Sequence, residues 1–189
     1  MKKKVLCLVL FAGLATTVFS WEPTDLTKYP AFMKPGDLIL NFGVGLDAGL
    51  FPEIGVSNCV YLPPVRLTFD WNTPLGDKGL PFFMGGLLGY QGHFHTKDDY
   101  SWHRMPIGFR FGYHFNWDID KFDTYAVATA GTTLHMGSGY KNIKANPLDW
   151  VHIGVNFGAR YFVSDGFGFW AEVGYSSYSW LAIGLSFKL

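Results

Sequence analysis

The last nine residues of the chain alternate strictly between apolar side chains and small or polar ones. In an extended strand over 181–189, one face would carry three leucines, an isoleucine and a phenylalanine. The other face would carry Ala182, Gly184, Ser186 and Lys188. Successive side chains of a strand point to opposite faces, so this segment has one face suited to lipid and one suited to a polar interior. The pattern is typical of the closing strand of a membrane barrel.

The same period of two recurs upstream. We predict strands over residues 38–46, 60–71, 82–94, 103–115, 124–136, 151–163, 167–176 and 181–189. The two faces are sorted most sharply in 103–115, and least sharply in 124–136, where we place Ala126, Ala128 and Ala130 on the inner face. Eight strands are an even number, as expected for a closed single-chain barrel. The predicted fold is therefore an all-β, eight-stranded antiparallel up-and-down transmembrane barrel.

A soluble eight-stranded barrel of the lipocalin kind is the main alternative. Its apolar face would line a ligand cavity, and its outer face would carry lysine, glutamate and threonine. Here the face opposite the apolar one carries glycine and scattered charge, which suits a narrow interior better than a solvated surface. We therefore expect the apolar face to meet lipid. The predicted lumen-lining residues are Arg66, Asp70, Arg104, Arg110, His152, Arg160, Glu172 and Lys188.

The first residues have the features of an export signal. Three lysines precede an apolar run over 5–18, which is shorter than the about 20 residues that a spanning helix needs. We predict that residues 1–20 are a secretory signal peptide. Residues 21–36 contain three prolines and form a periplasmic segment, either a tether or a fold under the barrel mouth. Residues 37–189 are then the single barrel domain, with Cys59 unable to form an intramolecular disulfide.

Charge and connection length add orientation. Without the three lysines at positions 2–4, the 15 basic residues fall to 12 against 15 acidic ones, which gives no reason to expect nucleic-acid binding. The connections after the second, fourth and sixth predicted strands are short, and those after the first, third and fifth are mostly longer. Outer-membrane barrels keep short turns in the periplasm and longer loops outside. Both termini are therefore expected in the periplasm.

The closing stretch, 172–175 followed by 181–189, resembles the end of many small eight-stranded outer-membrane barrels of diderm bacteria. This family includes OmpA-type, OmpX-type, opacity-type and OmpW-type proteins. The resemblance implies a monomer in the cell outer membrane, in contact with outer-membrane lipid and inserted by the barrel-assembly machinery through its C-terminal strand. The chain departs from the family pattern by ending on Leu189 instead of an aromatic residue.

The resemblance implies a fold more than an activity, because the family includes plugged anchors, narrow channels, adhesins and a few lipid-modifying enzymes. An eight-stranded interior is just wide enough for side chains to fill. Paired charges would seal it, whereas the inward glycines would free volume. We expect a narrow, anion-favouring passage for small solutes. The alternative is a non-conducting structural barrel, or a surface adhesin whose extracellular loops contact host surface ligands.

Histidines concentrate near the predicted outer strand ends. His93 and His95 are candidates for residues at the outer mouth, but a metal or porphyrin site would need a ligand spacing that this sequence lacks, so no metal site or cofactor is expected. His135 and Ser138 are close in sequence, yet no third member of a catalytic triad accompanies them. We therefore predict no catalytic residues and no enzymatic activity.

Overall fold

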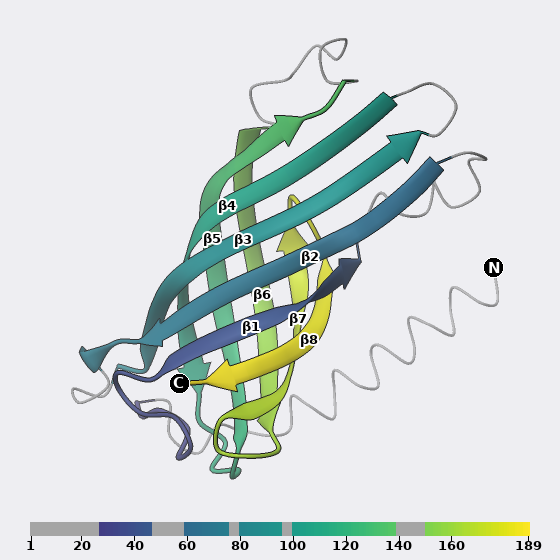
Figure 1. Cartoon of the computed structure of the whole chain (residues 1–189). Helices are drawn as coiled ribbons and strands as arrows, with labels where there is room; N and C mark the ends of the chain where they lie inside the picture. Colours follow the sequence, from purple (N-terminus) through teal and green to yellow (C-terminus); the bar gives the residue numbers. More distant parts are fainter. Residues whose placement is uncertain (1–26, 47–58, 76–79, 96–99, 139–149) are drawn as a thin grey trace, which may run out of the picture.

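The computed structural model describes residues 27–46, 59–75, 80–95, 100–138 and 150–189. Eight strands lie within these residues: β1 (Leu38–Leu46), β2 (Cys59–Asn72), β3 (Phe82–His95), β4 (Tyr100–Phe115), β5 (Phe122–Met136), β6 (Val151–Phe162), β7 (Phe167–Ser176) and β8 (Leu181–Lys188). Each strand pairs antiparallel with its neighbour in sequence, and β8 pairs with β1 to close the sheet. The predicted closed, eight-stranded, all-antiparallel barrel is confirmed (Figure 1).

The strand bounds follow the predicted ones closely. β1 and β7 have the predicted bounds, and the largest difference is at β4, which begins at Tyr100 instead of His103 because Tyr100 still pairs with His95 of β3. The predicted signal peptide, residues 1–20, lies outside the described residues, as do the connections 47–58, 96–99 and 139–149. No helix in the described part of the chain is long and apolar enough to cross a membrane.

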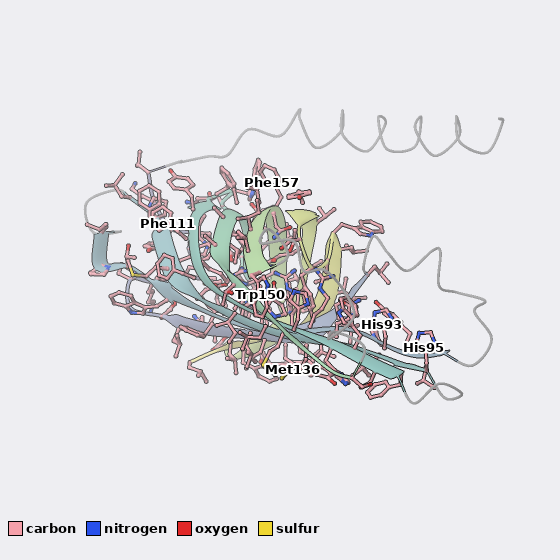
Figure 2. The ribbon with its side chains drawn as sticks, turned by 90° about the horizontal axis from the view of Figure 1, so that it is seen from above. His93, His95, Phe111, Met136, Trp150 and Phe157 are labelled. Atoms are coloured by element: carbon pink, nitrogen blue, oxygen red, sulfur yellow. The ribbon has the colours of Figure 1, made fainter. Side chains whose placement is uncertain are left out.

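The two faces of the sheet differ as the alternation predicts. On β6, Val155 and Phe157 are about three-fifths exposed, whereas Asn156 between them is buried. Phe111 of β4 is likewise exposed beside the buried Arg110, and Figure 2 marks Phe111 and Phe157 among the side chains of the barrel. The apolar face is therefore on the outside of the barrel, and the polar face lines its interior.

The inner face of β5 is opposite to the predicted one. Tyr125, Val127 and Thr129 are buried inside the barrel, and the alanines at 126, 128 and 130 face outward. These alanines pair in register with Tyr113, Phe111 and Phe109 of β4, so each small side chain lies beside a large outward ring. The polar residues Asp123, Thr129 and Thr133 share the inward phase with Tyr125, and their preference decides the orientation of the strand.

The two ends of the barrel are built differently. We call the end at which β1 begins and β8 ends the terminal end, and the opposite end the distal end. Strands β2 to β5 contain 14, 14, 16 and 15 residues, whereas β1, β7 and β8 contain 9, 10 and 8. The longer strands extend beyond the shorter ones at the distal end (Figure 1). The distal rim is therefore high on one side and low on the other.

The segment before β1 folds under the terminal end. Tyr29 and Met33 are buried in a cluster with Ile39 and Phe162, and Phe32 packs against this cluster. The Tyr29 hydroxyl donates to the carbonyl oxygens of Thr73 (3.0 Å) and Phe82 (2.5 Å). Of the two arrangements considered for residues 21–36, the described part therefore adopts the fold under the mouth.

Lys188 holds the same segment from the last strand. Its ammonium group donates to the Phe32 carbonyl oxygen at 2.9 Å, lies 3.8 Å from the centroid of the Phe32 ring and is 3.7 Å from an Asp37 carboxylate oxygen. A cation over an aromatic face is attracted by the ring quadrupole. Lys188 therefore belongs to the terminal mouth of the barrel and joins β8 to the segment that covers it.

Replacing Tyr29 with phenylalanine tests this cover. Tyr29→Phe keeps the ring and removes the hydroxyl that bonds two backbone carbonyls, so we expect a loss of about 1 kcal/mol in the free energy of unfolding. Urea unfolding of the refolded protein in detergent, followed by tryptophan fluorescence, measures it. Tyr161→Phe, on the exposed outer face, is the matched control. If both substitutions lowered the free energy of unfolding equally, the Tyr29 hydroxyl would not hold the covering segment in place.

Candidate functional site

The interior of the barrel is crossed by ion pairs between strands that are not neighbours. Arg110 of β4 bonds Asp70 of β2 through Nε (2.9 Å) and Glu172 of β7 through Nη2 (2.5 Å). Arg66 of β2 bonds the second Glu172 oxygen at 2.7 Å. All of these side chains are fully or almost fully buried. Because β2 and β7 lie on different sides of the closed sheet, these bonds span the lumen.

The ion pairs continue toward the terminal end. Arg160 of β6 bonds Asp70 and also Asp123 of β5, the latter at 2.8 Å. The second Asp123 oxygen lies 2.6 Å from Nδ1 of His114, whose Nε2 lies 3.0 Å from the Asn72 amide oxygen. We name the series Arg66, Glu172, Arg110, Asp70, Arg160, Asp123 and His114 the charge chain.

The carboxylates and guanidinium groups of the charge chain alternate in sign from Arg66 to Asp123. Three guanidinium groups face three carboxylates, and each carboxylate has two neighbours in the series. A buried charge without a partner is costly, and a carboxylate held between two donors is compensated on both oxygens. Each of these six charges is therefore neutralised by its neighbours in the charge chain.

Neutral groups complete the packing around these charges. The Tyr125 hydroxyl donates to Glu172 Oε1 at 2.8 Å, and the Arg160 guanidinium lies 4.1 Å from the Tyr125 ring centroid. Asn41 accepts from Arg160 Nε at 3.2 Å and donates to the Thr68 hydroxyl at 2.9 Å. These contacts satisfy donors that the carboxylates leave free and fix the orientation of the guanidinium groups.

The inward glycines make room for aromatic rings. A Cβ atom at Gly112 would lie 2.1 Å from the Phe83 ring, and one at Gly158 would lie 2.2 Å from the Tyr125 ring. Both rings are fully buried and contact each other edge to face, with centroids 5.4 Å apart. The volume that these glycines free is therefore occupied by side chains from other strands.

A tyrosine from the connection between β7 and β8 enters the lumen on the distal side. Tyr178 is almost fully buried, and its hydroxyl donates to the carbonyl oxygens of Val65 (2.9 Å) on β2 and Tyr90 (2.6 Å) on β3. A Cβ atom at Gly89 would lie 2.8 Å from its ring, so glycine is needed at that position. Burial raises the pKa of the Tyr178 phenol above its usual range, which keeps the hydroxyl protonated as a donor.

The predicted lumen residues divide into three groups. Arg66, Asp70, Arg110, Arg160 and Glu172 belong to the charge chain, and His152 is buried beside it with Nδ1 at 2.9 Å from the Ser177 hydroxyl. Arg104 is half-buried nearer the distal end and donates to the Ser177 carbonyl oxygen at 2.6 Å. Lys188 lies at the terminal mouth instead of in the lumen. Most of the residues that the alternation places on the inner face therefore lie close together in the lumen.

The candidate outer-mouth histidines lie at the distal end of β3 (Figure 2). His93 is buried, with its ring centroid 4.9 Å from that of Tyr61 and 5.0 Å from that of Trp102. His95 is half-buried near the end of the strand. Within the described ranges, no group of three histidine, cysteine, aspartate or glutamate residues is arranged to hold a metal ion.

The described contacts of His135 and Ser138 are with other residues. The His135 ring lies against Trp102 and Trp150, with centroids 6.0 and 5.6 Å apart. The Ser138 hydroxyl instead accepts a hydrogen bond from the Ser101 backbone amide at 3.0 Å. The aromatic contacts give His135 a packing role at the distal rim.

Sequence reasoning missed several members of the buried core. Asp123 joins Arg160 to His114 at the terminal end of the charge chain, Tyr125 bonds Glu172, and Tyr178 fills the distal lumen. Asp123 and Tyr125 share the phase of the polar β5 residues, so counting polar positions over the whole strand would have found them. Tyr178 lies in a connection without periodicity, and nothing in the sequence marks it as inward.

Comparisons with known proteins add a fold-level likeness. No family model matches the chain, and no curated protein matches it. Among solved structures, a chain described as "De novo design of transmembrane beta-barrels" is similar to it, with a TM-score of 0.46 and 17% sequence identity. The match covers 83% of this chain and 98% of the designed one. The fold is established by the closed sheet itself, and the likeness to the OmpA-type family remains one of pattern.

Removing the central arginine tests the charge chain. Arg110→Ala leaves Asp70 and Glu172 each without one of its two partners, so we expect a loss of about 3–5 kcal/mol in the free energy of unfolding. Urea unfolding in detergent measures it. Lys121→Ala, which removes a surface pair with Asp165, is the control and is expected to cost at most about 1 kcal/mol. A small effect of Arg110→Ala would show that the chain does not stabilise the barrel.

Proposed function

We propose that the protein is an integral outer-membrane barrel with a lumen closed to solute flow, which acts as a membrane anchor for its distal connections. The charge chain carries this proposal, because it joins opposite walls of the lumen through fully buried ion pairs. A solute on the axis would have to separate partners that have no access to water. A non-conducting barrel is therefore favoured over the narrow passage expected from the inward glycines.

Two further barriers support closure. At the terminal end, the residues around Tyr29 and Met33 are buried under the mouth. On the distal side, Tyr178 reaches across to carbonyl groups of β2 and β3. A path would have to pass the terminal cover, the charge chain and the Tyr178 ring in series. Moving any one of them would leave the other two in place.

The outer surface supports insertion into a membrane. Of the described side chains that face outward from the eight strands, none is aspartate, glutamate, lysine or arginine. A water-facing surface of this size would carry charge, whereas a lipid-facing one excludes it. Aromatic rings also gather at the terminal end, where Phe82 stacks on Phe111 and Phe167 packs on Phe187. Aromatic side chains are typical of the membrane interfaces of such barrels.

Orientation, assembly and partners follow as parts of the same proposal. The terminal end, with the covering segment and the short connection between β6 and β7, faces the periplasm. β8 serves as the strand that the barrel-assembly machinery recognises, and the barrel is inserted as a monomer in outer-membrane lipid. The distal end then presents its connections outside the cell, where contact with host surface ligands is a second candidate role.

Planar-bilayer recording of the refolded protein tests closure. We expect no discrete openings from wild-type protein that is shown to be folded, and none from Tyr178→Ala, because the charge chain still crosses the lumen in that variant. Arg110→Met removes the central guanidinium group and replaces it with an uncharged, unbranched side chain of similar size. Reproducible openings of the wild-type protein, with an anion preference altered in Arg110→Met, would support the narrow passage instead.

An arginine on the outer face tests membrane insertion. Phe157→Arg places a charge at one of the most exposed outward positions of β6, and we expect it to lower stability in lipid bilayers by about 2–4 kcal/mol if the site lies near the bilayer midplane. Val163→Arg, an exposed position just beyond β6 at the terminal end, is the control and should cost about 1 kcal/mol or less. Folding into vesicles with urea titration measures both. Equal costs would contradict the lipid-facing assignment.

A further inference from the structure

Four strands of the barrel continue past their neighbours at the distal end. The register between β1 and β2 ends at the pair Val44–Val65, and the register between β5 and β6 ends at the pair Thr132–Val151. β2 begins upstream of its last pair and β5 ends downstream of its own, so both strands run on (Figure 1). We name the parts of β2 to β5 that lie beyond these pairs the distal wall, which consists of residues 59–62, 91–95, 100–106 and 133–136.

The outward face of the distal wall is apolar. Val60 of β2, Phe94 of β3 and Met136 of β5 are 57, 39 and 44% exposed, and Leu62 and Leu134 are exposed between them. Among the described side chains of the wall, no aspartate, glutamate, lysine or arginine faces outward. A continuous apolar surface on a folded protein marks a place of contact, because water does not favour it.

The histidine on this outward face has its polar atom paired within the wall. Nδ1 of His103 lies 2.9 Å from the Tyr90 hydroxyl, and the imidazole ring contacts the Phe94 ring edge to face, with centroids 5.0 Å apart. A Cβ atom at Gly92 would lie 3.2 Å from Nδ1 of His103, so the glycine leaves room for this contact. A polar side chain that finds its partner on the same face is suited to surroundings without water.

The inward face of the distal wall is different in kind. His93 is buried there, the Gln91 amide donates to the Tyr61 hydroxyl at 3.3 Å, and Arg104 donates to the Ser177 carbonyl oxygen. The alternation of the two faces therefore continues to the distal ends of the strands. A sheet standing in water on both sides would carry polar residues on both faces. The sorting of the wall instead indicates that its outward face meets an apolar medium.

Strand length shows how lipid can reach the distal wall. At about 3.3 Å per residue, the 8 residues of β8 cross a hydrocarbon band about 25 Å thick almost upright, whereas the 15 residues of β5 cross it at about 60° from the membrane normal. Strands of such barrels incline by about 35–45° to the barrel axis, and seen from one side they lean in opposite directions on opposite walls. A tilt of the axis by about 20° in the plane of the distal wall adds to the inclination of the long strands and subtracts from that of β8.

We propose that the outward face of the distal wall is a lipid-binding surface that contacts acyl chains of the outer leaflet up to the distal ends of β2 to β5. The inference rests on the proposed membrane insertion and adds where the lipid-facing surface ends. Lipid is the occupant because the wall continues, on the same strands and in the same phase, the outward face on which no described side chain is charged. A tilted axis lets one bilayer cover both the long strands and the short ones.

Spin-label accessibility tests this surface. Cys7 and Cys59, the two cysteines of the chain, are replaced by serine, and a nitroxide is attached to Leu134→Cys in protein refolded into dilauroyl phosphatidylcholine vesicles. A label in lipid collides often with oxygen and rarely with a water-soluble nickel chelate. Because the hydrocarbon core excludes water, we expect the ratio of oxygen to nickel collisions at Leu134→Cys to be about tenfold higher than at a label in water.

Two reference labels calibrate the ratio. Phe157→Cys, on the exposed outer face of β6, gives the value for lipid, and Asp165→Cys, whose native side chain is 93% exposed in the turn between β6 and β7, gives the value for water. Val60→Cys carries the same test on β2 and decides the matter if Leu134→Cys does not refold. A ratio near that of Phe157→Cys at either wall position supports the proposal.

Three results would overturn it. A ratio near that of Asp165→Cys at the wall, with Phe157→Cys in lipid, would show that the wall projects into water while the barrel remains inserted. Low collision rates with both reagents at the wall would show that protein, such as a second copy of the chain, covers it. A label at Phe157→Cys that behaves as if in water would refute membrane insertion itself, so failure of this inference alone is distinguishable from failure of the proposed function.

Discussion

The arrangement of the barrel interior depends on one constraint, which is that the closed lumen leaves buried charges no access to water. Eight strands enclose a space that side chains fill, and every charge placed there must find its partner across that space. The charge chain meets this demand by alternating sign from Arg66 to Asp123, whose carboxylate also contacts the His114 ring. Because its bonds join β2, β4, β5, β6 and β7, it also links walls that the backbone ladder leaves unconnected. The interior polar groups and the closed sheet therefore stabilise each other.

Glycine and aromatic positions obey the same constraint. A narrow interior can hold Phe83 and Tyr125 only where the register partner on the neighbouring strand lacks a Cβ atom, and Gly112 and Gly158 are those partners. The rings then pack against the guanidinium of Arg160, which lies over both of them. The glycines are consequently part of the packing of the charge chain. Glycine content in a small barrel is a poor guide to an open path when large inward side chains occur on other strands.

The sequence predicts the strands well because one physical preference acts at every second position. Apolar side chains face outward and polar ones inward, so the bounds of β1 and β7 follow directly from alternation. This preference weakens where the side chains on both faces of a strand are small or moderately apolar. The inward face predicted for β5 is wrong because alanine is compatible with either face. Its orientation is decided by Asp123, Thr129 and Thr133, together with the large rings of β4 beside the alanines.

Pairing inside the lumen is harder to predict than phase. Alternation places Arg110 and Asp70 inward, but their contact depends on how far neighbouring strands are staggered around the barrel, which no single strand encodes. Tyr178 presents the same difficulty, because its connection has no period and its partners lie on β2 and β3. Alternation therefore predicts the strands and their inward positions, whereas the partners of an inward side chain depend on the closed barrel, which brings Tyr178 against the carbonyl groups of β2 and β3.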